Sequence, residues 1–171
     1  MNWFSRTQLL IGEDGVKKLA GSHVLVVGLG GVGAYAAEQL ARAGIGTMTI
    51  IDSDTVNVTN KNRQLLALDS TLGRPKVDVM ADRIRDINPE INVIPINQYL
   101  KDQSIIDLMA QPFDFIVDAI DTLAPKVFLL YYAVQNKQKI VSCMGAGGKF
   151  NPEMIQITDI SKSYNCRLAF Y

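Results

Sequence analysis

The stretch VVGLGGVGAYAAEQLARAGIGTMTIID, residues 26–52, constrains the fold more than any other part of the sequence. A short β-branched run stops at glycines, an alanine-rich helix follows, and a second apolar run ends at Asp52. Gly28, Gly30 and Gly33 have the G-x-G-x-x-G spacing that lets backbone N–H groups approach a phosphate at the positive end of a helix. The stretch therefore predicts a strand–helix–strand unit that binds a nucleotide.

Strands and helices are expected to alternate along the whole chain. Apolar, β-branched runs predict strands at residues 24–28, 47–52, 91–96, 113–119, 139–144 and 154–158. Apolar residues at helical spacing predict helices at residues 31–43, 75–88, 104–110 and 123–136. Pro95 suggests that the third strand lies at an edge. The alternation predicts an α/β fold, a Rossmann-like, doubly wound, mostly parallel sheet with helices on both faces, and a ligand beyond the carboxyl ends of its strands.

Composition narrows the class of protein. At 171 residues, 48% of them hydrophobic, the chain is expected to form one domain, residues 1–171. Lys plus Arg and Asp plus Glu both number 17, and this balance argues against a general polyanion binder while allowing a local RNA-binding patch. Cys143 and Cys166 form neither a metal-binding pattern nor a disulfide framework. No signal peptide or membrane-length apolar run is present, so we expect a soluble, cytoplasmic protein.

The residue at the end of the second strand does not distinguish NAD from ATP as the nucleotide. A carboxylate at Asp52 can accept hydrogen bonds from ribose hydroxyls, which both NAD and ATP carry. A dehydrogenase also needs an acid or base that handles the hydride chemistry, most often a histidine. The only histidine, His23, precedes the first strand, and we expect a structural or surface role for it. Asp54 is either a second ligand or a cap of the turn.

The polar residues after Asp54 favour a triphosphate. Asn60, Arg63 and Gln64 place two amides and a guanidinium within five residues. Lys76 lies in the first turn of the helix expected at 75–88, where a cation opposes the helix dipole unless a polyphosphate also binds there. A solvated lysine is the alternative.

A second acidic strand end suggests a metal. Asp118 and Asp121 flank the end of the strand expected at 113–119, and a carboxylate there can bind Mg²⁺ together with substrate phosphates. We take Asp121 as the metal ligand, while the alternative is that Asp121 or Thr122 only caps the next helix. With the glycine loop, Arg63 and Lys76, these residues predict a site for ATP and Mg²⁺, and NAD would give Arg63, Lys76 and Asp121 no role.

Five segments in order, GLGGVG, DSDTV, TNKNRQ, GRPK and DAIDT, resemble the ThiF/MoeB family of adenylating enzymes, relatives of ubiquitin-activating enzymes. The resemblance covers residues 4–122 and implies that a substrate carboxylate attacks the α-phosphate of Mg-ATP, giving an acyl-adenylate and pyrophosphate. By the same resemblance, Gly30 and Gly31 line the phosphate loop and Asp52 holds the ribose. Its further site residues are those that contact ATP or the metal: Asn60, Arg63, Lys76 and Asp121.

Within this family, FSRTQLLIGEDGVKKL, the GAGG at 145–148 and IQITDISK at 155–162 resemble the tRNA threonylcarbamoyladenosine dehydratase branch, TcdA or CsdL. That branch implies a substrate tRNA carrying threonylcarbamoyladenosine, whose carboxylate is adenylated before the side chain cyclises. It also implies a homodimer in which Arg6 reaches the partner's nucleotide, with a solvated arginine as the alternative. The family continues beyond TDISK, whereas this chain ends in SYNCRLAFY, so we expect a C-terminal segment of the family to be lacking.

Two other functions stay open at this point. One is adenylation of the Gly-Gly tail of a ubiquitin-like sulfur carrier, and the other is a nucleotide-binding fragment without turnover. The absence of CxxC pairs and the GAGG segment favour tRNA. Cys143 falls in an expected strand, which favours a packed thiol over a nucleophile. A basic stretch is explained mostly as a solvated helix face: Lys61, Arg63, Arg74, Lys76, Arg83 and Arg85.

Overall fold

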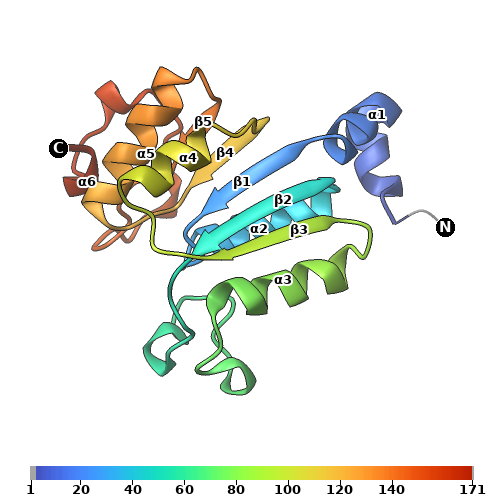
Figure 1. Cartoon of the computed structure of the whole chain (residues 1–171), viewed down its shortest axis with the longest axis horizontal. Coiled ribbons are helices and arrows are strands. Elements are labelled where there is room, and N and C mark those ends of the chain that lie inside the picture. The colour runs from blue at the N-terminus through green and yellow to red at the C-terminus, as the bar shows by residue number, and fades with distance from the viewer. Residues whose placement is uncertain (1–2, 171) are drawn as a thin grey trace.

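The computed structural model describes residues 3–170, which form one parallel sheet with helices on both faces (Figure 1). The spatial order of the strands is β3-β2-β1-β4-β5, and every neighbouring pair is parallel. The predicted α/β, doubly wound fold is therefore confirmed. The strands are β1 (His23–Val27), β2 (Thr47–Asp52), β3 (Asn92–Asn97), β4 (Phe115–Asp118) and β5 (Ile140–Ser142).

The helices follow the predicted alternation closely. The predicted helices appear as α2 (Gly33–Ala43), α3 (Lys76–Ile87), α4 (Gln103–Met109) and α5 (Leu123–Gln135). Two further helices are α1 (Ser5–Ala20) and the short α6 (Arg167–Phe170). Across the described part of the chain, no helix combines the length and the apolar character that spanning a membrane requires.

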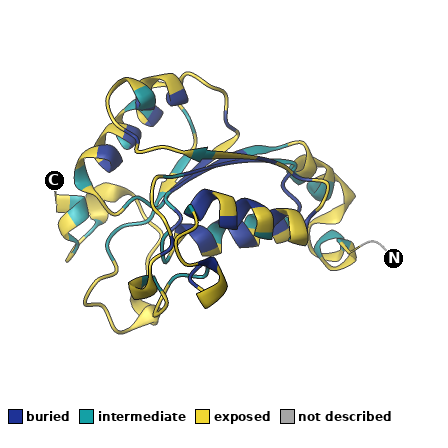
Figure 2. Ribbon diagram, turned by 60° about the horizontal axis from the view of Figure 1, so that its bottom comes forward, coloured by how far each residue is buried: buried dark blue, intermediate teal, exposed yellow. Residues whose placement is uncertain are grey.

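The sheet separates two hydrophobic cores because successive side chains of a strand point to opposite faces. Val24 and Val26 of β1 belong to the core covered by α2 and α3. Leu25 and Val27, the alternate residues, belong to the core covered by α4 and α5. Figure 2 shows these buried residues along the sheet and on the inward faces of the helices. Burial on both faces explains why the central strands are continuous apolar runs.

The order of the strands also locates the binding crevice. The chain moves outward from β1 through β2 to β3, then returns across the sheet to β4 on the other side of β1. Ligands of open α/β sheets bind beyond the carboxyl ends of the strands where the order reverses. Here that point lies between β1 and β4. Pro95 lies in β3, at the edge that its missing N–H suggested.

The N-terminal helix α1 was not predicted from the sequence. It has a kink at Gly12, whose φ of 75° is left-handed, and none of its residues is buried. The Leu19 carbonyl accepts a hydrogen bond from the N–H of Gly46, just before β2, so α1 ends at the amino edge of the sheet. Arg6, in its first turn, is exposed, and α1 as a whole lies at the far end of the sheet from the crevice (Figure 1).

The strand expected at residues 154–158 is wrong. A short 3₁₀ turn, Pro152–Met154, is followed by irregular chain, and the side chains of Ile155 and Ile157 are 78% and 97% exposed. Alternating apolar residues stabilise a strand mainly through the neighbours against which they pack. No other strand lies beside these residues in the described structure, so the alternation alone does not make one.

Candidate functional site

A cavity of about 230 Å³ opens at the crevice between the carboxyl ends of β1 and β4. It brings together most of the residues that the sequence singled out, although they come from segments almost 100 positions apart. The predicted residues that line it are Gly28, Gly30, Asp52, Asp54, Asn60, Arg63, Gln64, Lys76, Asp121 and Thr122. Gly31, Gly33 and Arg6 are not among its lining residues.

The glycine loop is shaped by close backbone packing. Gly28 has a φ of 88°, and a Cβ there would lie 2.7 Å from the carbonyl oxygen of Ala119. A Cβ on Gly33 would lie 1.8 Å from the carbonyl oxygen of Gly28, so no side chain fits. Gly33 therefore acts on the cavity indirectly, by letting α2 begin directly against the loop. Gly31 lies outside the cavity, next to the Arg63 side chain.

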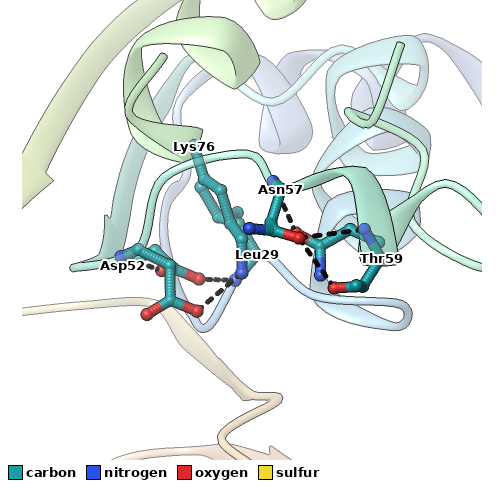
Figure 3. Close-up of polar contacts among 7 residues, drawn as sticks. Leu29, Asp52, Asn57, Thr59 and Lys76 are labelled. Atoms are coloured by element: carbon teal, nitrogen blue, oxygen red, sulfur yellow. Dashed lines mark hydrogen bonds and ion pairs between the residues drawn. The ribbon is translucent and has the colours of Figure 1, made fainter. Parts of the chain in front are cut away.

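The Asp52 carboxylate ties the glycine loop to the end of β2, as Figure 3 shows. Its Oδ2 accepts a hydrogen bond from the Leu29 N–H at 2.6 Å, and its Oδ1 accepts one from the Asp54 N–H at 2.8 Å. Asp52 is thus the residue that caps this turn, whereas Asp54 had been the expected cap or second ligand. The Asp52 side chain is half-buried and lies where a ribose-binding carboxylate is expected.

Lys76 is buried, which rules out the solvated-lysine alternative. Its side chain is only 5% exposed, and its Nζ lies 2.7 Å from the Asp54 Oδ2. Two further contacts hold the segments together: the Lys76 N–H donates to the Asp54 carbonyl, and Thr55 forms an isolated bridge with Pro75. The Asp54 side chain is 66% exposed. A buried ammonium is thus fixed in the cavity wall opposite a carboxylate that water already solvates.

The loop after Asp54 carries the second cation. The Asn57 Oδ1 accepts the Thr59 N–H at 2.9 Å, and the Asn60 Oδ1 accepts the Asn57 N–H at 3.0 Å (Figure 3). The Arg63 Nη1 donates to the Thr59 carbonyl at 3.2 Å and to the Asn62 Oδ1 at 2.9 Å. Within residues 3–170, Arg63 has no carboxylate in ion-pairing distance. Its guanidinium charge is therefore available to an anion in the cavity.

The two aspartates at the end of β4 differ in role. Asp118 is fully buried, and its Oδ2 lies 2.6 Å from the Lys126 Nζ, so its charge is already compensated. Asp121 is exposed and lines the cavity. Thr122 occupies the position before α5, yet its side chain makes no capping hydrogen bond. The structure therefore assigns the free carboxylate of this strand end to Asp121.

The donor set suits a magnesium ion that is held mainly by phosphate. In the described residues, no group of three or more His, Cys, Asp or Glu side chains is placed to hold a metal. Mg²⁺ typically binds one or two protein carboxylates and completes its shell with water and substrate phosphates. Asp121 is an exposed carboxylate in a cavity that also holds Lys76 and Arg63, and it fits this pattern, whereas the exposed Asp54 is already paired with Lys76.

Part of the cavity wall was not predicted. Gln98, Tyr99 and Leu100, from the loop after β3, and Pro125 of α5 also line the cavity. Leu100 is buried and Tyr99 is half-exposed, so this side offers an apolar surface. The only sequence signal for it was the position after a strand end, because the segment contains no glycine or acidic residue.

Two other predicted residues keep structural roles. The His23 Nε2 lies 2.8 Å from the Thr49 Oγ1, and the ring packs edge-on against Phe113. Burial lowers the pKa of His23, and the nearby Asp114 carboxylate opposes this shift. Burial likewise raises the pKa of the Cys143 thiol, which fits a packed thiol rather than a nucleophile.

The basic stretch is largely neutralised within the chain. Lys61 pairs with Asp69, Arg83 pairs with Glu38, and Lys76 pairs with Asp54. The remaining pairs are Arg74–Asp82 and Arg85–Asp82. Only Arg63 in this stretch is without an ion pair in the described structure, so the stretch offers little net positive surface to a nucleic acid.

Comparison with known proteins places this geometry in context. The ThiF family profile matches residues 4–170. The tRNA threonylcarbamoyladenosine dehydratase of Escherichia coli K12 is 44% identical over 166 residues, which cover 97% of this chain and 62% of that protein. The molybdopterin-synthase adenylyltransferase of Escherichia coli K12 is 43% identical over 111 residues, 65% of this chain and 44% of that protein.

A solved structure shows the same architecture. The crystal structure of the E. coli tRNA N6-threonylcarbamoyladenosine dehydratase in complex with ATP matches with a TM-score of 0.96 and 44% identity, over 98% of this chain and 69% of that chain. The chain thus spans somewhat less than two thirds of the full length of that curated dehydratase. Because the family profile covers nearly all of the sequence, the chain belongs to the ThiF family.

Proposed function

We propose that this chain binds ATP and Mg²⁺ and adenylates the carboxylate of threonylcarbamoyladenosine in tRNA, promoting dehydration of that side chain to a ring. The observation that carries the proposal is the cavity at the β1–β4 crevice, which gathers a glycine loop, a ribose-accepting carboxylate, two cations and a free acidic group. A chain 44% identical to this one has been crystallised with ATP. A nicotinamide dehydrogenase would leave Lys76, Arg63 and Asp121 without a function.

The positions of the side chains suggest how the nucleotide is held. Asp52 accepts the ribose hydroxyls, and the backbone around Gly30 faces the phosphates at the start of α2. Leu100 and Tyr99 form the apolar wall that suits a base. Because this wall and the glycine loop lie on different sides of Asp52 in the sheet order, the ribose bridges them.

The cations supply most of the expected rate enhancement. Phosphoryl and adenylyl transfer demand little covalent chemistry from the protein, so catalysis rests on orientation and on charges aimed at the reacting phosphate. Lys76 is buried and fixed, so its charge acts in a poorly screened position. Arg63 adds a second charge at the mouth of the cavity. A carboxylate nucleophile is already ionised at neutral pH, and no catalytic base is needed.

Asp121 is the residue that would hold Mg²⁺, which supplies charge neutralisation on the phosphates when bound. The protein's own part is to keep that carboxylate facing the cavity while Asp118, three residues earlier, stays paired with Lys126.

A sulfur-carrier protein is the second candidate substrate, because the molybdopterin-synthase adenylyltransferase shares 43% identity over 65% of this chain. The tRNA-modifying relative matches far more of the chain, 97% against 65%. This difference favours tRNA.

Pyrophosphate release distinguishes these candidates. The purified chain is incubated with Mg-ATP and, in separate reactions, with threonylcarbamoyladenosine-modified tRNA, unmodified tRNA or a sulfur carrier ending in Gly-Gly. Stimulation by the modified tRNA alone is expected. Stimulation by the carrier alone would establish the second candidate, and ATP binding without stimulation by any substrate would identify a non-catalytic nucleotide-binding chain.

We further propose that two copies associate and that Arg6 serves the partner's cavity, since Arg6 is exposed on α1, the helix that lies away from the cavity of its own chain (Figure 1). Mixing an Arg6→Ala chain with a Lys76→Ala chain would then restore activity, because a mixed dimer contains one site with both residues intact. Mixtures no more active than the separate variants, or a chain that stays monomeric by light scattering, would contradict this arrangement.

A further inference from the structure

The most deeply buried charged pair of the described chain lies outside the cavity, directly behind it. The Lys126 side chain on α5 is 1% exposed and the Asp118 side chain at the end of β4 is 0% exposed, with 2.6 Å between Nζ and Oδ2. The Ser142 hydroxyl of β5 donates to the same Oδ2 at 2.5 Å. Three elements thus meet at one carboxylate, and neither Lys126 nor Ser142 lines the cavity.

The other oxygen of that carboxylate controls the loop that does line the cavity. The Asp118 Oδ1 accepts a hydrogen bond from the Ile120 N–H at 3.0 Å, which turns the chain sharply after β4. Asp121 follows directly and faces the cavity. Rotation of the Asp118 carboxylate would therefore move the peptide that carries Asp121.

The loop after β4 is also packed tightly against the glycine loop. The Ala119 carbonyl lies 2.7 Å from the position that a Cβ on Gly28 would take, so the loop after β4 is packed directly on the glycine loop. A shift of the loop after β4 is therefore passed to the phosphate-binding loop as well as to Asp121.

Stability alone is a weak reason for such a pair. The desolvation of two buried charges commonly offsets their attraction, and apolar side chains of similar size often stabilise a core equally well. Loss of one partner, in contrast, leaves a buried charge unpaired and is costly. A pair that is costly to break and gives little stability acts chiefly by fixing geometry.

We propose that Lys126 and Ser142 are positioning residues, which hold the Asp118 carboxylate so that the loop at 119–122 presents Asp121 to the metal and phosphates. This rests on the proposed ATP site and assigns to these residues a role in it that requires no contact with the nucleotide. Groups that orient a metal-binding carboxylate typically change metal affinity or activity by about 10- to 100-fold when removed.

The decisive variant removes both charges together. Asp118→Asn combined with Lys126→Met leaves no unpaired charge in the core, so the chain is expected to fold and to unfold near the wild-type temperature. ATP affinity without Mg²⁺ should fall by a smaller factor than the Mg²⁺ effect, because a shift of the loop reaches the phosphate-binding loop only through Ala119, whereas the contact of Asp52 with the glycine loop remains. The gain in ATP affinity on adding Mg²⁺, and the rate of pyrophosphate release, should both fall by about 10-fold or more.

Two further variants keep the test decisive. Ser142→Ala retains the ion pair and is expected to fold normally while weakening the Mg²⁺ dependence severalfold, so it gives a result even if the double variant fails to fold. Lys139→Met makes the Lys-to-Met exchange at an exposed lysine before β5 and should change neither measurement.

The results separate this proposal from the function on which it rests. A folded double variant with wild-type Mg²⁺ dependence and turnover, or an unaffected Ser142→Ala chain, would overturn the positioning role. A wild-type chain that binds ATP more tightly with Mg²⁺ but releases no pyrophosphate would count against the adenylation reaction alone, because the Mg²⁺ effect on ATP binding still reports the position of the loop. Absence of ATP binding by the wild type would overturn both.

Discussion

The loops around the cavity and the segment after β5 are held in different ways. The cavity loops after β2 and β4 are each tied by a side chain to a backbone N–H, as in Asp52 with Leu29 and Asp118 with Ile120, and Asp118 is fully buried. In residues 145–166 the cited side-chain hydrogen bonds stay within the segment, and the side chains of Phe150 and Ile157 are each 97% exposed. Figure 2 shows this contrast as a buried sheet beside a mostly exposed segment.

This difference between the two regions indicates which contacts determine the geometry of the cavity. The β1–β4 cavity depends on contacts that reach the two cores, so a change in its walls should alter function or stability measurably. The segment after β5 contributes few such contacts, and changes there should have small effects on the folded chain. The four predictions below test this contrast.

The largest effect is expected at Lys76. Lys76→Ala removes the one buried cation of the cavity wall and should lower the rate of pyrophosphate release by about 100-fold or more. Stability should change little, because the Asp54 left behind is largely exposed. Lys61→Ala, which breaks an exposed ion pair with Asp69, is the matched control. Equal rates for the Lys76 and Lys61 variants would remove Lys76 from the site.

The second-largest effect is expected for a substitution in the glycine loop, which should reduce the stability of the fold. The Cβ of Gly33→Ala would meet the Gly28 carbonyl oxygen at 1.8 Å, and such overpacking costs about 1–3 kcal/mol. The melting temperature should fall by about 3–10 °C. Gly147→Ala in the other region has no atom within 4 Å of the new Cβ, so its melting temperature should remain near that of the wild type. Similar decreases in melting temperature for the Gly33 and Gly147 variants would contradict the difference between the cavity loops and the segment after β5.

An acid-dependent effect is expected where α2 meets α3. Hydrogen bonding from Arg83, with a further contribution from Arg42, lowers the pKa of the buried Glu38 carboxyl below its usual value, despite the opposing effect of burial. A folded-state pKa below the unfolded one gives stability that is present at neutral pH and is lost as the pH falls below about 4.3 and through the folded value.

Glu38→Gln should therefore reduce the free energy of unfolding at pH 7 by about 1 kcal/mol, since both arginines are partly exposed. In urea titrations, the difference from wild type should shrink as the pH falls into this acid range. A difference that is independent of pH would show that the ionised carboxylate is not its source.

The smallest effect is expected after β5. Ile157→Ser replaces a side chain that is 97% exposed, so the free energy of unfolding should stay within about 0.5 kcal/mol of wild type. Ile50→Ala, in the core beneath α2 and α3, should cost about 2–5 kcal/mol. A large loss from Ile157→Ser would mean that the segment packs against the fold more closely than its exposure indicates.

The sequence was most informative where the physical signal is local. The run from 47 to 52 is β-branched and apolar because both its faces are buried, and its strand was predicted with its observed bounds. The glycine spacing likewise predicted the tight loop between β1 and α2, because only residues without a side chain fit where Gly28 and Gly33 approach the neighbouring backbone.

Features that depend on distant partners were harder to predict. Helix α1 was missed because it buries no residue and contains Gly12, so it lacks the apolar stripe of a packed helix. No strand forms at the expected residues 154–158, because no other strand of the described structure lies beside them to pair with. The burial of Lys76 and the pairing of Asp118 with Lys126 depend on which segments the fold brings together, and no local pattern reports that.

The proposed function requires that the nucleotide bind in the β1–β4 cavity. The direct measurement is a crystal structure of the chain with Mg²⁺ and an ATP analogue that resists cleavage next to the α-phosphate. We expect the ribose on Asp52, the phosphates between the glycine loop and Lys76, and the metal beside Asp121. An analogue bound elsewhere, or a cavity that remains empty at saturating nucleotide, would contradict the account.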